Sequence, residues 1–393
     1  MHLNALKSIE NHIDVALQAC LVQDGSPIFA SYADKVFHLS QEVMKHKNEW
    51  LTVSSCYSIF SHHLFSYLER KFPVKEGVSG KLTVLIDGPG IIELKSSILN
   101  FIISIPRSYE IYFPLPSFKD QEINNIQLWN SVSIRKFDEG DTIPGGIILN
   151  TLFGSKRFVI GTTYVGIKRS GYVSSSINDI ALKEALSSLK QLLHMCLILN
   201  LIALQEPAIS WADVAMSLGG GPPEAITVDL ANQNEISSSI MLPLSIRSYL
   251  QKIVLNTSLE YFKNKLNETS NLIERNDNDA QFIKSALEWA FDSQIEENET
   301  ISFIQVSIGL EAILGEETGR EPLTETLADR CAYLLGNTIE NRKKIRRKFR
   351  DFYKLRSKLV HGRSMRLKDN EREFLWWGRK VLDGVILKEI KKI

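Results

Sequence analysis

The chain has 393 residues, and its 46 lysine and arginine residues balance 46 aspartate and glutamate residues, so the formal net charge is zero. Hydrophobic residues make up 44% and charged residues 23%, proportions that are typical of globular proteins and exclude long disorder, collagen and coiled-coil arrays. The length predicts two or three domains, each large enough for its own core. A neutral total argues against a nucleic-acid partner only if the charge is spread evenly.

The cysteines and the apolar segments indicate the cellular setting. Cys20, Cys56, Cys196 and Cys331 form no CxxC pair, which favours free thiols in a reducing compartment. Residues 1–16 lack the apolar core of a signal peptide, and the most apolar run, 192–204, is too short to span a membrane. We therefore expect a cytoplasmic protein with no membrane contact, no metal and no cofactor.

The first half of the chain reads as mixed α and β. Helices are predicted near 32–46 and 54–71. Short runs rich in isoleucine, valine and aromatic residues then predict strands at 82–86, 98–105, 109–113, 146–152 and 158–165. Asp87–Gly90 and Pro144–Gly146 are expected to be plain turns, because neither fits a phosphate-binding loop. A long helix is predicted over 179–205.

The second half reads as helical after a glycine- and proline-rich segment that includes Gly219–Pro223. Helices are predicted near 244–267, 278–292, 299–315, 323–335, 338–361 and 369–391. The expected fold class is α+β. Its parts are a mixed α/β sensor or regulatory domain at 1–205, a linker or long loop at 206–238 and a helical domain at 239–393.

The charge is concentrated in the predicted helix 338–361. Between Asn341 and Arg363, eleven cations face a single acid, Asp351, which gives a local net charge of +10. An almost single-signed stripe is typical of a surface that binds a polyanion, whereas a merely solvated helix carries mixed signs. The candidate RNA-binding cations cluster on one side of this helix, and they are Lys343, Arg346, Arg347, Arg350, Lys354 and Lys358.

The ends of this helix and its apolar face can also be predicted. An Asn337–Glu340 capping box is expected at its start, and Gly362 is expected just beyond its end. With about 100° per residue, the core-facing stripe consists of Ile345, Phe349, Phe352, Leu355, Leu359 and Val360.

Two polar residues of this helix stand out. Arg356 falls inside the apolar stripe, where it needs a partner, and Glu311 is the expected one. His361 falls on the basic side, about 140° from Arg356, with Ser357 one turn before it. A structural ion pair and a plain C-terminal cap explain these two residues equally well, and the sequence leaves both alternatives open. The adjacent His62 and His63 point in different directions, which favours a surface or packing role over a metal site.

Arg356 and His361 form an RxxxxH motif, and three blocks around it resemble the Apea-like branch of the HEPN domain family. The blocks are IGLEAIL at 308–314, LADRCAYLLG at 327–336 and FYKLRSKLVHG at 352–362. The resemblance covers residues 278–393. It implies a helical HEPN bundle that forms a homodimer, and a metal-independent endoribonuclease of bacterial toxin and anti-phage systems that acts by abortive infection.

The resemblance also implies roles for individual residues. Arg356 would stabilise the scissile phosphate and His361 would act as general acid or base while the ribose 2′-hydroxyl attacks. Ser357 would orient His361, and Glu311 would position Arg356. Tyr353 would touch a base or the phosphate. The implied partners are an RNA substrate, with tRNA among the candidates, and a phage-derived trigger protein or an antitoxin.

Two other functions fit the same residues. A non-catalytic HEPN module would bind RNA or nucleotides, or only dimerise. A regulatory scaffold would dock an acidic protein on the basic helix. Because the rest of the chain carries a matching acidic excess, we also expect that its acidic surface covers the basic helix at rest.

Overall fold

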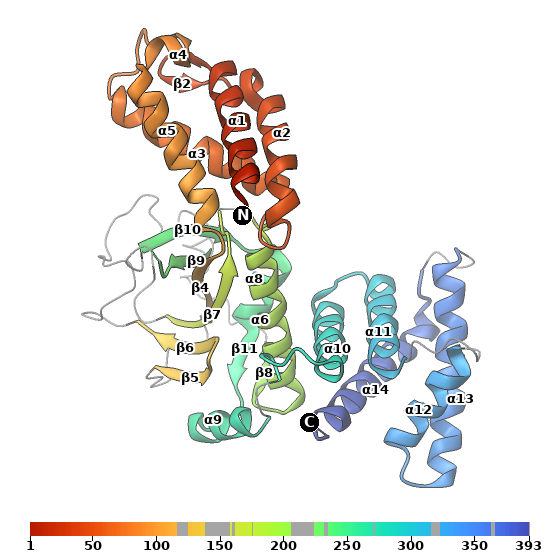
Figure 1. Cartoon of the computed structure of the whole chain (residues 1–393). Coiled ribbons are helices and arrows are strands. Elements are labelled where there is room, and N and C mark those ends of the chain that lie inside the picture. The colour runs from red at the N-terminus through yellow and green to blue at the C-terminus, as the bar shows by residue number, and fades with distance from the viewer. Residues whose placement is uncertain are drawn as a thin grey trace.

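The computed structural model describes residues 1–115, 125–137, 158, 162–174, 176–205, 224–231, 235–269, 272–315, 323–362 and 366–392. N-terminal helices, a central sheet and a C-terminal helical region can be followed in Figure 1. The protein is therefore a mixed α+β protein with a helical C-terminal region, as predicted.

The first 105 residues form a helical body. Its helices are α1 (Leu3–Ala19), α2 (Phe29–Lys47), α3 (Val53–Lys71), α4 (Leu82–Leu85) and α5 (Gly88–Ser104). Three short strands, β1 (Leu21–Gln23), β2 (Ser26–Pro27) and β3 (Gly80–Lys81), pair in the order β2–β1–β3. Buried side chains such as Ile13, Val36 and Phe60 build a core that is separate from the core of the sheet and the C-terminal helices.

The strands predicted at 82–86 and 98–105 are wrong, because both segments are helical. Leu94, Ile98 and Ile102 recur every four residues and form the buried face of α5, so an apolar helix face resembled a strand. Asp87–Gly90 is a helix start and not a plain turn. The Asp87 side chain caps α5 by accepting a hydrogen bond of 3.1 Å from the Gly90 amide.

A six-stranded antiparallel sheet forms the centre of the molecule, with the order β10–β9–β4–β7–β6–β5. Its strands are β4 (Arg107–Leu115), β5 (Ile126–Trp129), β6 (Val132–Lys136), β7 (Thr163–Gly171), β9 (Glu224–Asp229) and β10 (Glu235–Met241). The strand predicted at 109–113 is confirmed as part of β4. The strand predicted at 158–165 overlaps only the start of β7, while 146–152 and Pro144–Gly146 lie outside the described residues.

Strands β9 and β10 correct the linker predicted at 206–238. They pair with each other, and β9 also pairs with β4, so this part of the chain belongs to the sheet. The run Ala225–Val228 is buried throughout, and a strand covered on both faces lacks the alternation that would have revealed it. Residues 206–223, with the glycine- and proline-rich segment, lie outside the described residues.

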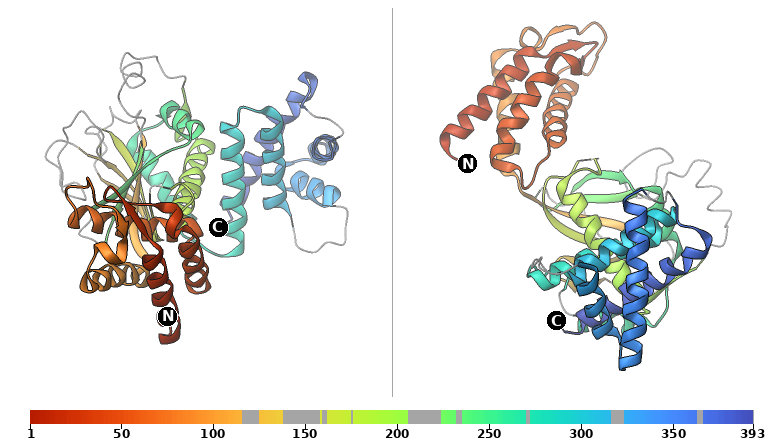
Figure 2. Two further views of the ribbon diagram at one scale, coloured as in Figure 1. Left: turned by 90° about the horizontal axis from the view of Figure 1, so that it is seen from above. Right: turned by 90° about the vertical axis from the view of Figure 1, so that its right-hand side faces the viewer.

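Helix α6 (Ile180–Ile198) contacts all three parts of the molecule. Asp179, at its N-terminus, accepts hydrogen bonds from the Ser55 hydroxyl of α3 at 2.9 Å and from the Ser174 amide at 2.7 Å. Along its length α6 packs between β7 and α10 (Asn278–Ile295) of the C-terminal region (Figure 1 and Figure 2). The helix predicted at 179–205 is therefore too long, and its last residues form β8 (Ile202–Leu204), which pairs with β11 (Ile253–Leu255).

The C-terminal helices follow the prediction closely. Beyond α10 they are α11 (Glu299–Leu314), α12 (Leu323–Leu335), α13 (Ile339–Val360), the 3₁₀ turn η2 (Asp369–Glu371) and α14 (Arg372–Ile390). Only the helix predicted at 244–267 is divided, into α8 (Leu244–Lys252), β11 and α9 (Leu259–Glu268). Sheet, α6 and bundle share one hydrophobic core, so the boundary predicted between residues 205 and 239 does not separate two cores.

Two further expectations concern the cysteines and the membrane. All four cysteines are buried and free. Among the helices that the structure describes, none combines the length and the apolar character that crossing a bilayer demands.

Close packing of α14 against α13 generates a stability prediction. A Cβ atom on Gly378 would lie 2.6 Å from Cε2 of the buried Phe352 ring, whereas one on Gly384, in the same helix, would meet only Cδ2 of Leu335 at 3.2 Å. We expect Gly378→Ala to lower the free energy of unfolding by about 1–3 kcal/mol through overpacking. Gly384→Ala should be neutral or stabilising, because alanine favours helix. Urea unfolding measures both, and equal effects would contradict this packing.

Candidate functional site

The candidate site lies on α13, whose two ends are set by local chemistry. The Thr338 hydroxyl caps the start by accepting a hydrogen bond of 3.1 Å from the Asn341 amide, so the predicted Asn337–Glu340 capping box is wrong by one residue. Gly362 lies just past the end with φ +68°, a conformation that favours glycine, which confirms its predicted place. His361 is the C-cap residue between Val360 and Gly362.

Four of the six residues of the predicted stripe are buried, and Ile345 is half-buried against the same core. Phe349, Phe352, Leu355 and Leu359 are buried, while Val360 is 45% exposed. Tyr353, which was expected to touch a base or the phosphate, is also buried, and its ring stacks on Phe349 with 5.0 Å between the ring centroids. Tyr353 therefore belongs to the core in this structure.

Arg356 is paired with Glu311 of α11, as predicted. Its Nη2 atom lies 3.1 Å from Oε1 and 3.4 Å from Oε2 of the carboxylate. The Nε atom of Arg356 and the hydroxyl of Tyr353 are both buried, and neither has a hydrogen-bond partner among the described residues. Burial and the negative charge of Glu311 raise the pKa of Tyr353 well above its usual range. Glu311 thus holds the guanidinium through a single nitrogen.

His361 and Ser357 lie on the exposed side of the same helix. The His361 amide donates to the Ser357 carbonyl at 3.1 Å, which is the last turn of the helix. Within the described part of the chain, no hydrogen bond joins the Ser357 hydroxyl to the His361 ring or links His361 to Arg356. Arg356 faces α11 and His361 faces outward, so one chain alone does not bring the two motif residues together.

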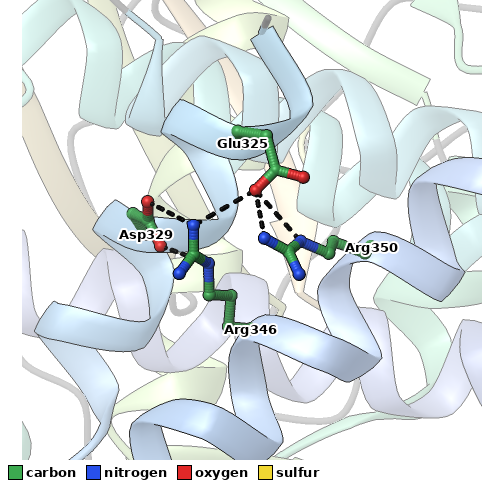
Figure 3. A network of polar contacts seen from close by, with 4 residues as sticks. All are labelled: Glu325, Asp329, Arg346 and Arg350. Atoms are coloured by element: carbon green, nitrogen blue, oxygen red, sulfur yellow. Dashed lines mark hydrogen bonds and ion pairs between the residues drawn. The ribbon is translucent and has the colours of Figure 1, made fainter.

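The six candidate RNA-binding cations fall into two groups. Arg346 lies 2.6 Å from Asp329 and 3.2 Å from Glu325, and Arg350 donates through Nε to the same Glu325 carboxylate at 3.0 Å (Figure 3). Glu325 and Asp329 come from α12, which packs on α13. In the second group Lys354 pairs with Asp351 of its own helix at 3.2 Å, and with no other acid among the described residues. Lys343, Arg347 and Lys358 are exposed and have no ion pair with any described residue.

This pairing was not predicted from the sequence, because the charge of α13 was considered without that of its neighbours. The signal lies in the preceding helix, where Glu325 and Asp329 are four residues apart and therefore share a face of α12. Other cations of α13 have partners too, since Arg342 lies over the ring of Tyr333 at 4.6 Å and Lys344 pairs with Glu340 at 3.3 Å. The local charge of +10 thus overstates the free positive charge.

His62 and His63 do not form a metal site with each other. The Nδ1 atom of His63 lies 2.9 Å from the Ser97 hydroxyl, and its ring packs on Phe101, which agrees with the predicted packing role. Among the described residues, no three His, Cys, Asp or Glu side chains gather as a metal ion would need.

Comparison with known proteins returns no match. No protein-family model fits the chain, and no curated protein or solved structure shows significant similarity to it. The resemblance to HEPN domains therefore rests on the three sequence blocks. The structure places these blocks on α11, α12 and α13, three consecutive helices of the C-terminal region.

A double-mutant cycle tests whether Glu311 holds Arg356. Glu311→Gln should lower the free energy of unfolding by about 1–2 kcal/mol, because it leaves a part-buried guanidinium without its counter-charge. In an Arg356→Gln background, Glu311→Gln should lower the free energy of unfolding by much less. Glu340→Gln, in an exposed pair, is the control and should change little. Equal effects of Glu311→Gln in both backgrounds would show that the two side chains are not coupled.

The environment of His63 leads us to predict that the free energy of unfolding depends on pH. Burial, followed by the positive charges of His62 and Arg107, lowers the pKa of His63 to about 4. An unfolded histidine titrates near 6.5, so the unfolded chain binds a proton first and stability falls as the pH drops from about 6.5 to about 4. At pH 5 the loss relative to pH 7.5 should reach up to about 2 kcal/mol. Thermal unfolding of His63→Gln should show a smaller loss, whereas His46→Gln, at an exposed position, should behave as wild type.

Proposed function

We propose that this protein is a metal-independent endoribonuclease of the HEPN type, which cleaves RNA through Arg356 and His361 and acts in anti-phage defence by abortive infection. The observation that carries the proposal is the end of α13. There a guanidinium held by Glu311 and an exposed imidazole lie on the same two turns of helix, next to exposed cations.

The chemistry suits these two side chains. A base removes the proton of the ribose 2′-hydroxyl, the 2′ oxygen attacks phosphorus, and the bond from phosphorus to the 5′ oxygen breaks. The leaving oxygen takes up a proton, so the products are a 2′,3′-cyclic phosphate and a 5′-hydroxyl end. Histidine suits both proton transfers, and arginine suits the negative charge that develops on the phosphate.

The proposal requires two copies of the chain. Because Arg356 and His361 point about 140° apart on one helix, a phosphate between them needs groups from a second α13. The exposed Val360, next to His361, supports such a contact because it presents an apolar side chain beside the motif. A symmetric homodimer would then supply one imidazole as base and the other as acid.

The remaining parts of the protein receive regulatory roles in this proposal. The N-terminal helices and the sheet act as the sensor, and a phage-derived protein or an antitoxin sets whether RNA, tRNA included, is cut. A regulatory scaffold that docks an acidic protein is the second candidate. It is favoured by one observation, the exposure of Lys343, Arg347 and Lys358, since the carboxylates of an acidic polypeptide would pair with these cations.

Cleavage of total RNA by the purified full chain tests the proposal. We expect 5′-hydroxyl ends at defined sites, mapped by sequencing RNA ends, from cells with and without infection and from the isolated protein. Arg356→Ala and His361→Ala should each slow cleavage by about 10²- to 10⁴-fold, since each removes a group that acts in the transition state. His46→Ala, at an exposed position far from the motif in sequence, is the matched control.

Each contrary outcome points to one alternative. Cleavage at the wild-type rate by Arg356→Ala or His361→Ala would refute the assigned residues. Tight binding of RNA by the wild-type chain, with no cleavage in any of these conditions, would identify a binding module. Preference for an acidic polypeptide over RNA would identify the scaffold.

A further inference from the structure

The cations on the outer side of α13 form two rows. With about 100° per residue and Lys343 set at zero, Arg347, Lys354 and Lys358 fall at about 40°, 20° and 60°. All four side chains are exposed. Arg350 and Arg346 fall at about −20° and −60°, on the other side of Lys343, and their partners on α12 distinguish them from the first row. His361 falls at about 0° on the same count, so this exposed row runs along α13 and ends at the imidazole of the RxxxxH motif.

The exposed row is straight because it follows one side of a single helix. At a rise of about 1.5 Å per residue, Lys343 and Lys358 are about 22 Å apart along the helix. Among the residues that the structure describes, the ion pair of this row is that of Lys354 with Asp351, and it leaves the lysine side chain 73% exposed. A straight line of flexible cations can neutralise successive phosphates of a backbone without reading bases.

The second row consists of Arg346 and Arg350, which point toward α12. Their guanidinium groups are engaged by Glu325 and Asp329, and Glu325 lies between the two arginines (Figure 3). The two guanidinium groups donate three hydrogen bonds to the Glu325 carboxylate, and Arg346 donates a fourth to Asp329, which also lies 2.6 Å from its Nε atom. These arginines therefore already have the anions that they need.

We infer that the two rows have different functions: the exposed row binds the phosphates of single-stranded RNA and leads the backbone to His361, while Arg346 and Arg350 fasten α12 to α13 and do not bind RNA. The inference rests on the proposed function for the nature of its ligand. Single-stranded RNA is the substrate class that fits, because the row is straight and because attack by a 2′-hydroxyl requires a linkage free to align with its leaving group.

Binding to an uncleavable probe tests the inference. The probe is an oligouridylate of about 20 nucleotides with 2′-O-methyl groups, which cannot be cleaved by 2′ attack, and its fluorescence anisotropy is followed at several salt concentrations. Four cations on a single strand predict a slope of about −2.8 in log K against log salt. Lys343→Gln, Arg347→Gln and Lys358→Gln should each reduce the slope by about 0.7 and weaken binding without changing Tm.

The arginines of the second row provide matched controls on the same helix. Arg346→Gln and Arg350→Gln should lower Tm and leave the salt slope of the folded protein unchanged. Glu325→Gln together with Asp329→Asn frees both guanidinium groups and should steepen the slope. Loss of binding by Arg346→Gln equal to that of Arg347→Gln would overturn the division into two rows, as would tighter binding of polyglutamate than of RNA.

The results of the binding and cleavage experiments distinguish a failure of this inference from a failure of the proposed function. If the exposed-row variants lose binding while ordinary RNA stays intact in the presence of wild-type protein, the RNA surface stands and the nuclease proposal fails. If wild-type protein cleaves RNA and the exposed-row variants bind the probe normally, the nuclease proposal stands and the inference fails.

Discussion

Helix α6 contacts the N-terminal helices, the central sheet and the C-terminal helices, and the arrangement of the whole molecule depends on these contacts. Its N-terminus is tied to α3 through Asp179 and Ser55, and its length packs on the sheet and on α10. Toward the bundle, Lys190 pairs with Asp292 at 2.8 Å and the buried His194 with Asp383 of α14 at 2.9 Å. Because α6 is buried on most sides, a displacement of the sheet cannot leave the bundle unaffected. This gives the proposed sensor a physical connection to the site on α13.

In the C-terminal region, charged side chains of one helix form ion pairs with charged side chains of another helix. Glu325 and Asp329 of α12 compensate Arg346 and Arg350 of α13, and exposed pairs of this kind individually contribute only about 0–1 kcal/mol. Two arginines that share one carboxylate form a network, however, and a network fixes the angle between two helices better than isolated pairs do. The neutral total charge of the chain therefore reflects local compensation in part, and the uncompensated cations stand out as a narrow line leading to His361.

The C-terminal helices could be predicted from sequence because their apolar residues recur with a helical period and their ends carry caps. The burial of Phe352 and the place of Arg356 beside it follow from that period, and Gly362 follows from the cap. The predictions failed where burial removes the period, as in Ala225–Val228, and where a helix is apolar enough to resemble a strand, as in α5. Partners on other helices, such as Glu325 for Arg350, depend on tertiary packing that one helix does not encode.

The separate core of the N-terminal helices has a consequence for how such a chain can diversify. One covalent crossing, from Ile105 to Arg107, links that body to the sheet. Among the described residues, contacts between the two include those of Asp179 with Ser55, Arg107 with Phe101, and Tyr172 with Ser58 and Phe101. A different helical domain could replace it by recombination at this crossing without exposing the apolar interior of the remainder. The sheet and the C-terminal helices have no such freedom because they share an interior, so they would be inherited together while the N-terminal body could change.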